Sequence, residues 1–283
     1  MTTKSNVIIP EVMSDMINAK IEAMLKITPY AKVDTSLQGV AGDTKTVPSW
    51  NYVGDAVDVA EGAEVELSSL TAGTKQFTIK KAMKSIGLTE ESVNSGMGNP
   101  IGQAEMQIAK AIAGKVDSDV LAAALTSSLV SGDGSTKISY AGIVDAVDMF
   151  DEEEITEKVM FIAPTQASTL RKDSDFTSAD RYNNNVMMNG EIGMVAGVRV
   201  VTSKKIVDDG GVFTCPILKL EPANAETEFT EDELPAVTIF LKKDTQVDAE
   251  WKPRKQTHEI TGAKYYGVAL TNESKVVLAK FKK

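Results

Sequence analysis

The sequence predicts an α+β protein. Residues 44–93 hold two β-like arms around an acidic middle, residues 100–130 have the apolar spacing of one long helix, and residues 137–220 alternate helices with strands. The chain has 283 residues, 42% of them hydrophobic and 25% charged. It can therefore bury a sizeable core in one large or two ordinary domains.

Composition excludes several classes of function. The formal net charge of −10 argues against a protein that grips phosphate backbones over most of its surface. Cys215 is the single cysteine and His258 the single histidine, so one chain can build neither a disulfide nor a Cys/His zinc site. No run approaches the ~18 apolar residues of a membrane span, and no signal-peptide core is present. We expect folding in the cytosol and no membrane partner.

The first elements are an arm and a helix. Residues 1–9 are polar and then briefly apolar, as in an arm that becomes ordered against a partner. Residues 11–25 carry apolar side chains at helical spacing. Pro29 ends this helix, because the residue before a proline disfavours the α conformation.

The long hairpin region follows, with arms predicted at residues 46–53 and 76–88. No Lys or Arg lies between Lys45 and Lys75. Five acidic residues occupy that interval: Asp55, Asp58, Glu61, Glu64 and Glu66. So polar a middle cannot be buried in its own core, and we expect its tip to project into water or onto another molecule. Considered alone, it reads as a solvated loop.

The long helix begins at a strong start signal. Asn99 is the predicted N-cap, and Pro100 occupies the first helical position, where its missing N–H costs nothing. An apolar stripe then continues to residue 130, which predicts a rod of roughly 45 Å that serves as the backbone of a domain. A coiled coil is the alternative, which Gly102, Gly114 and the absence of a strict heptad disfavour. Residues 131–136 (SGDGST) mark the main domain boundary.

The second half is predicted as a series of short elements. Ser139 caps a helix, and the strand that contains Cys215 is apolar enough to make this cysteine a packed small hydrophobe. The predicted elements are a helix at 140–153, a strand at 158–163, a helix from Pro164, two strands around Ala196-Gly197 and a strand at 212–220.

Two charged stretches come next. Residues 221–235 include several acidic residues and no basic one, which predicts a flexible loop. Paired carboxylates could carry out acid–base chemistry, but no apolar residues surround these to separate their pKa values. Residues 237–260 are mostly extended and form the most basic part of the chain, with Lys242, Lys243, Lys252, Arg254 and Lys255. Interleaved acids favour a protein–protein strip there. A phosphate-binding face with Trp251 as a stacking residue is the alternative.

Residues 264–281 close the chain as two strands around a turn at 271–274. No P-loop, GxGxxG or GxSxG motif is present. We therefore expect no enzyme, and we assign no catalytic, cofactor-binding or metal residues.

In this order the elements resemble a known family. The segments VPSWNYVGDAVDVAEGAEVELSSL, FTIKKAMKSIGLTEESV, FIAPTQASTLRKD, GMVAGVRVVTS and YYGVALTNESKVVLAKF are similar to those of the Hong Kong 97-type major capsid proteins of tailed double-stranded DNA phages. The resemblance covers nearly the whole chain, and its specificity lies in the joint order of the segments.

The resemblance implies a division of the chain by position. Residues 1–43 would be the N-terminal arm and lead-in, and residues 44–88 the extended loop. Residues 89–136 and 237–260 would form the peripheral domain with its long spine helix. Residues 137–236 and 261–283 would form the axial domain around five-fold and six-fold positions.

It also implies a function: a shell protein that self-assembles into pentamers and hexamers of an icosahedral head enclosing double-stranded DNA. Implied partners are a separate scaffolding protein, since the chain begins almost directly at the arm, a portal protein, and DNA held without sequence-specific binding. The virion is the implied location, after assembly in the host cytoplasm. Because residues 55–74 contain no Lys, the covalent cross-link of some family members is not expected.

We hypothesise that the acidic residues Asp55 to Glu66 dock on the basic residues Lys242 to Lys255 of a neighbouring subunit. Two rival functions remain. An encapsulin-like bacterial shell would share the fold and hold enzyme cargo. A carboxylate-dependent hydrolase would be a compact monomer with a pocket.

Overall fold

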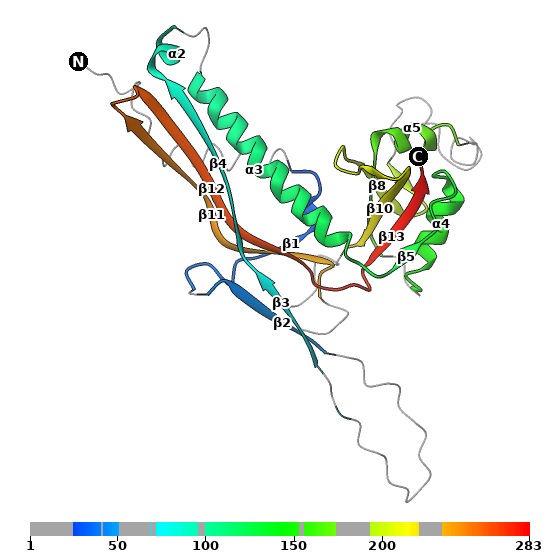
Figure 1. Cartoon of the computed structure of the whole chain (residues 1–283). Coiled ribbons are helices and arrows are strands. Elements are labelled where there is room, and N and C mark those ends of the chain that lie inside the picture. The colour runs from blue at the N-terminus through cyan, green and yellow to red at the C-terminus, as the bar shows by residue number, and fades with distance from the viewer. Residues whose placement is uncertain are drawn as a thin grey trace, which may run out of the picture.

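The computed structural model describes residues 25–40, 42–50, 69, 72–95, 100–152, 156–173, 193–220 and 234–283. Within these ranges the chain forms a four-stranded sheet, a seven-stranded sheet and a two-stranded hairpin. Figure 1 shows the four-stranded sheet and helix α3 as one elongated body, the second sheet with α4 and α5 as a compact body, and the hairpin pointing away from both. This mixture confirms the predicted α+β class.

The elongated body is a sheet with one helix along its face. Its strands are ordered β1 (Lys32–Asp34), β11 (Val237–Lys252), β12 (Thr257–Leu270) and β4 (Lys80–Thr89), and β1 pairs parallel to β11 while the others pair antiparallel. Helix α3 (Pro100–Ala124) packs against β12 and β4. Gly262 of β12 permits this contact, because a Cβ there would lie 2.5 Å from Cγ2 of Ile108. The helix and sheet thus approach closely at that point.

The helix begins at Pro100 as predicted, but it ends at Ala124 rather than at residue 130. The Thr126 hydroxyl donates to the Ala123 carbonyl at 2.6 Å, and the Ser127 hydroxyl donates to the Val276 carbonyl at 2.7 Å. Such side chains offer the backbone an alternative to the helical ladder. The chain then enters β5 (Val130–Ser131), which pairs parallel to β13 (Val276–Lys282).

The compact body has the predicted order of elements, but its first helix ends at Asp148 rather than at residue 153. Helix α4 (Tyr140–Asp148) has Ser139 as N-cap, whose hydroxyl accepts from the Gly142 N–H at 3.2 Å. The remaining elements are β6 (Lys158–Ile162), α5 (Pro164–Leu170), β7 (Met194–Val195), β8 (Val198–Thr202), β9 (Asp208–Asp209) and β10 (Val212–Lys219).

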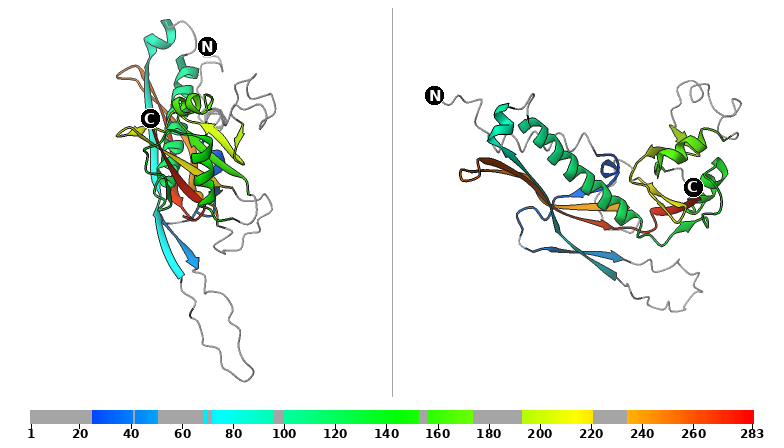
Figure 2. Two further views of the ribbon diagram at one scale, coloured as in Figure 1. Left: turned by 90° about the vertical axis from the view of Figure 1, so that its right-hand side faces the viewer. Right: turned by 45° about the horizontal axis from the view of Figure 1, so that its top comes forward.

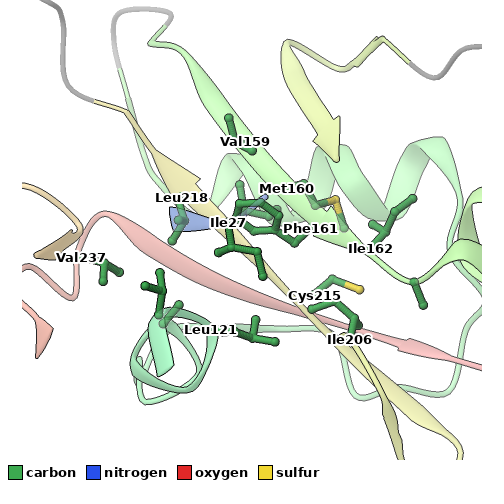
Figure 3. Packing of buried hydrophobic residues seen from close by; sticks show 14 of the residues in the cluster. Ile27, Leu121, Val159, Met160, Phe161, Ile162, Ile206, Cys215, Leu218 and Val237 are labelled. Atoms are coloured by element: carbon green, nitrogen blue, oxygen red, sulfur yellow. The ribbon is translucent and has the colours of Figure 1, made fainter. Parts of the chain in front are cut away.

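The two bodies share one hydrophobic core. Ile27 and Leu121 reach the strands of the second sheet, beside Phe161, Cys215 and Leu218 (Figure 3). Cys215 is fully buried, and burial raises the pKa of its thiol to about 12. Its predicted role as a packed hydrophobe is confirmed.

Residues 237–260 are mostly extended, as predicted, but they belong to two strands and not to one. Strand β11 ends at Lys252, the Lys255 N–H donates to the Lys252 carbonyl at 3.1 Å, and Gln256 takes a positive φ of 48°. Pro253 offers no N–H to continue the ladder. The chain therefore turns back as β12.

Two further assignments differ in the structure. The predicted second hairpin arm divides at Ile79: β3 (Ala72–Thr78) pairs with β2 (Thr44–Trp50), whereas β4 pairs with β12. The two closing strands flank their turn but join different sheets, because β12 pairs with β11 and β4 while β13 pairs with β10. In the turn between β12 and β13, the N–H groups of Thr271 and Asn272 donate to the Ala236 carbonyl. These hydrogen bonds hold the turn that leads the chain from one sheet to the other.

Candidate intersubunit surface

The base of the β2–β3 hairpin is fixed to the four-stranded sheet. The Phe77 and Phe240 rings stack at 5.8 Å between centroids, and the Ile79 N–H donates to the Asp43 carbonyl at 2.8 Å. The Lys242 ammonium bonds Oδ1 of Asp43 at 2.6 Å and the carbonyl of Gly42 at 2.5 Å. Both views of Figure 2 show the hairpin leaving the body as a separate projection.

The hairpin pairs from Thr44 opposite Thr78 to Trp50 opposite Ala72. At about 3.3 Å per residue, its far end lies roughly 20 Å from its base. The predicted acidic contact residues Asp55, Asp58, Glu61, Glu64 and Glu66 follow this far end in the sequence and lie outside the described residues. Predicted N-cap Asn99, most of the predicted helix 11–25 and most of the loop 221–235 also lie outside them.

The five predicted basic residues divide into two groups, one within β11 and one at the end of that strand. Lys242 contacts the hairpin base and Lys243 follows it in the strand, whereas Lys252, Arg254 and Lys255 lie at the β11–β12 turn, roughly 30 Å away. Lys242 is already paired with Asp43. Lys252 bonds the Glu259 carboxylate, and this hydrogen bond raises the pKa of Lys252. The structure therefore does not bring the five into one strip.

An anchor that the sequence did not reveal ties the lead-in segment to α3. Asp117 of α3 is buried in the protein interior. Its carboxylate accepts hydrogen bonds from the N–H groups of Lys26, Ile27 and Thr28 at 3.0, 3.3 and 3.0 Å. It also accepts from the Thr28 hydroxyl at 2.6 Å. In the sequence, the position of Asp117 within the apolar stripe of the helix is the one signal that could have predicted this anchor.

A second carboxylate of α3 holds the sheet. Asp119 accepts from the Tyr266 hydroxyl at 2.6 Å and pairs with Lys80 and Lys115, each at 2.9 Å. Burial alone would raise the pKa of Asp119, but the hydrogen bonds from Tyr266, Lys80 and Lys115 outweigh it and lower that pKa. Burial and the Asp119 charge raise the pKa of Tyr266.

A part-buried ion cluster stabilises the compact body. Glu152 pairs with Lys158 at 2.5 Å and Lys219 at 2.8 Å, and it accepts from the Thr156 hydroxyl. Burial opposes ionisation, but the bonds from Lys158, Lys219 and Thr156 lower the pKa of Glu152 to about 2. Glu152, one of four consecutive acidic residues at 151–154, is therefore a structural carboxylate.

The single histidine lies beside a carboxylate and an aromatic ring. His258 lies 3.3 Å from Glu90 and contacts the Trp251 ring, and no group of three His, Cys, Asp or Glu in that part of the chain could hold a metal. In the same ranges, no helix is both long and apolar enough to cross a membrane.

Comparisons with known proteins agree with this architecture. A family model described as phage capsid protein matches residues 72–278. A relative described as the major capsid protein of Staphylococcus phage phiMR11 is 32% identical over 278 residues, which cover 98% of this chain and 94% of that protein. Two solved structures share the fold: the mature capsid of bacteriophage PhiM1 (TM-score 0.69, 12% identity, 91% and 87% of the two chains) and Mycobacterium phage Che8 (0.67, 15%, 87% and 88%).

Proposed function

Because the chain belongs to the phage capsid protein family, and is a shell-forming major capsid protein with the Hong Kong 97-type fold, we propose that it builds an icosahedral head around double-stranded DNA. The observation that carries the proposal is the hairpin β2–β3, a long projection fixed at its base and unsupported along its length by its own chain's described elements. Such a projection suits contact with a second copy.

In this proposal pentamers and hexamers of the chain form the shell. Each contact is weak, and the closed shell is stable because every subunit makes the contact several times. The acidic residues beyond the hairpin dock on basic residues of a neighbour. Within the predicted set, Lys243, Arg254 and Lys255 are exposed and have no ion pair with another described residue, so they are the available members of that set.

The strand pairing supports a division of roles within the subunit. In this division the extended loop ends at Thr78, and α3 with the four-stranded sheet is the peripheral domain, which includes β4 and β12. The axial domain is the seven-stranded sheet with α4 and α5. It groups around the five-fold and six-fold positions.

The proposed partners are those of head assembly. A separate scaffolding protein directs closure, and a portal protein occupies one vertex. The net charge of −10 suits a container wall that holds DNA without sequence-specific binding. Assembly takes place in the host cytoplasm before the shell becomes part of the virion.

Electron microscopy of the expressed chain, with and without a co-expressed scaffolding protein, tests the proposal. We expect closed icosahedral particles in at least one of the two preparations. Sedimentation as a monomer in both would contradict it and would favour the hydrolase alternative. In particles from infected cells, DNA inside supports the phage head, whereas packed enzyme cargo and no DNA would support the encapsulin-like alternative.

A further inference from the structure

The outer edge of the four-stranded sheet carries a cluster of lysines. Among the described residues β4 pairs with β12 on one side and with no strand on the other, and it follows the margin of the molecule in the left view of Figure 2. Lys80, Lys81 and Lys84 all lie on this strand and are exposed. Lys115 of α3 adds a fourth ammonium beside them through their shared contact with Asp119.

The edge has an excess of positive charge. Lys80 and Lys115 share one carboxylate, that of Asp119. The Lys81 ammonium lies over the Tyr265 ring, 5.5 Å from its centroid, and Lys84 has no ion pair within the described residues. The β12 residues opposite this part of β4, residues 261–266, include no acidic side chain. The four lysines and one carboxylate leave three positive charges on a chain whose net charge is −10.

The edge also fits an extended polypeptide. An unpaired strand presents a row of free N–H and C=O groups, to which another strand can add. Because side chains alternate along a strand, Lys80 and Lys84 point toward α3, where Lys80 meets Asp119, while Lys81 and Met83 point to the opposite face. Met83 is 58% exposed, so that face offers an uncovered apolar contact beside Lys81.

We infer that the β4 edge is the principal acceptor for the acidic segment, residues 55–66, of a second copy of this chain. The inference rests on the proposed shell function and names the contact surface within it. That segment has five acids and no basic residue, and Glu64-Val65-Glu66-Leu67 alternates acidic and apolar residues in the pattern of a strand with one charged face. Its charges match the lysines, and its apolar positions match Met83.

Two observations favour this acceptor over others. The basic residues of β11 are divided between two sites, and Lys242 and Lys252 already bond carboxylates of their own chain. A DNA duplex would use the lysine charges but not the free backbone groups of an edge strand, so a polypeptide fits more of the surface.

Charge reversal tests the inference in the full chain, under the conditions in which the wild type forms particles. Replacing Lys81 and Lys84 with glutamate makes the charge of the edge more negative by four units. Both side chains are exposed, so the subunit should fold. Arg171→Glu with Lys172→Glu makes the same change at two exposed residues that follow α5 on the compact body, and this pair is the matched control. We expect the first pair to lower the particle fraction in low-salt sedimentation about tenfold or more, and the control to lower it far less.

Compensation and cross-linking make the test specific. Adding Glu64→Lys and Glu66→Lys to the K81E/K84E chain should restore particles. When Glu64→Cys and Lys84→Cys chains are co-expressed and oxidised, a disulfide dimer should form, whereas Glu64→Cys with Lys172→Cys should give none. The cross-link measures directly whether residues 64 and 84 of two chains lie close together. It therefore tests the inference even if the charge variants misfold.

Several results would overturn the inference. They are wild-type particle yield for K81E/K84E, no rescue by the glutamate reversals, no E64C–K84C dimer, or normal shells that have lost their DNA, which would assign the lysines to the packaged genome. A wild-type chain that forms no particle under any condition would instead refute the proposed function itself.

Discussion

Replacing Asp117 with alanine should detach the lead-in segment from α3. The substitution leaves the N–H groups of Lys26, Ile27 and Thr28 and the Thr28 hydroxyl without their acceptor, and Ile27 and Thr28 are buried. A buried donor that loses its partner costs about 1–3 kcal/mol. The part-buried Lys26 N–H can turn to water, so the three buried donors that remain should together lower the free energy of unfolding by about 3–9 kcal/mol.

The assay is urea unfolding of unassembled subunits, followed by circular dichroism. Asp133→Ala is the matched control, because Asp133 accepts from the Ser135 N–H at 2.9 Å in an exposed turn, where water replaces the lost bond. Thr28→Val removes the shortest of the four bonds and should cost about 1.5–3 kcal/mol. In the D117A/T28V double variant the two losses should be less than additive, because both changes remove the same contact.

A loss below about 1 kcal/mol for D117A, or full additivity in the double variant, would refute this reasoning. The first would mean that water satisfies the freed donors, and the second that Thr28 and Asp117 do not depend on each other. Either result would remove Asp117 as the anchor of the segment that contains Ile27.

Three other outcomes follow from the described contacts. Gly262→Ala should lower the unfolding free energy by about 1–3 kcal/mol in a thermal melt, because its Cβ would lie 2.5 Å from Cγ2 of Ile108; an unchanged melting temperature would show that α3 can move away. Glu152 has a pKa of about 2 against an ordinary 4.5, so its contribution is complete above pH 4.5 and is lost as the pH falls toward 2. The free energy of unfolding, measured in urea across that pH range, should fall less steeply for Glu152→Gln than for the wild type. An equal pH dependence in the two proteins would contradict the ion cluster with Lys158. Cys215, with a thiol pKa of about 12 and no exposure, should react with a thiol reagent at the rate of unfolding; immediate labelling of the native protein would exclude the packed position.

Local sequence signals predicted several elements correctly. Pro100 gives the start of α3, Ser139 gives the cap of α4, and the Ala196-Gly197 pair gives the turn between β7 and β8, where both residues take positive φ. Each of these signals acts within a few residues, through a missing N–H, a side-chain acceptor or a permitted backbone angle. Their success needs no knowledge of the rest of the chain.

Pairing between distant segments could not be predicted in the same way. The pattern of residues 76–88 predicts extended backbone throughout. No local feature of the sequence indicates that β3 pairs with β2 while β4 pairs with β12. The roles of Asp117, Asp119 and Glu152 depend likewise on partners that lie far away in sequence or on a different element.

By itself the sequence determined the element types, the acidic and lysine-free middle of the extended loop, and, through the joint order of its segments, the capsid family. The tertiary structure decided which basic residues remain available to that loop. Ion pairs within the subunit occupy Lys242 and Lys252, whereas the sheet places Lys81 and Lys84 on an edge without a neighbouring strand among the described residues. The reason is physical: charge is a property of the chain, but whether a charge is already neutralised depends on the three-dimensional distance to its counter-charge.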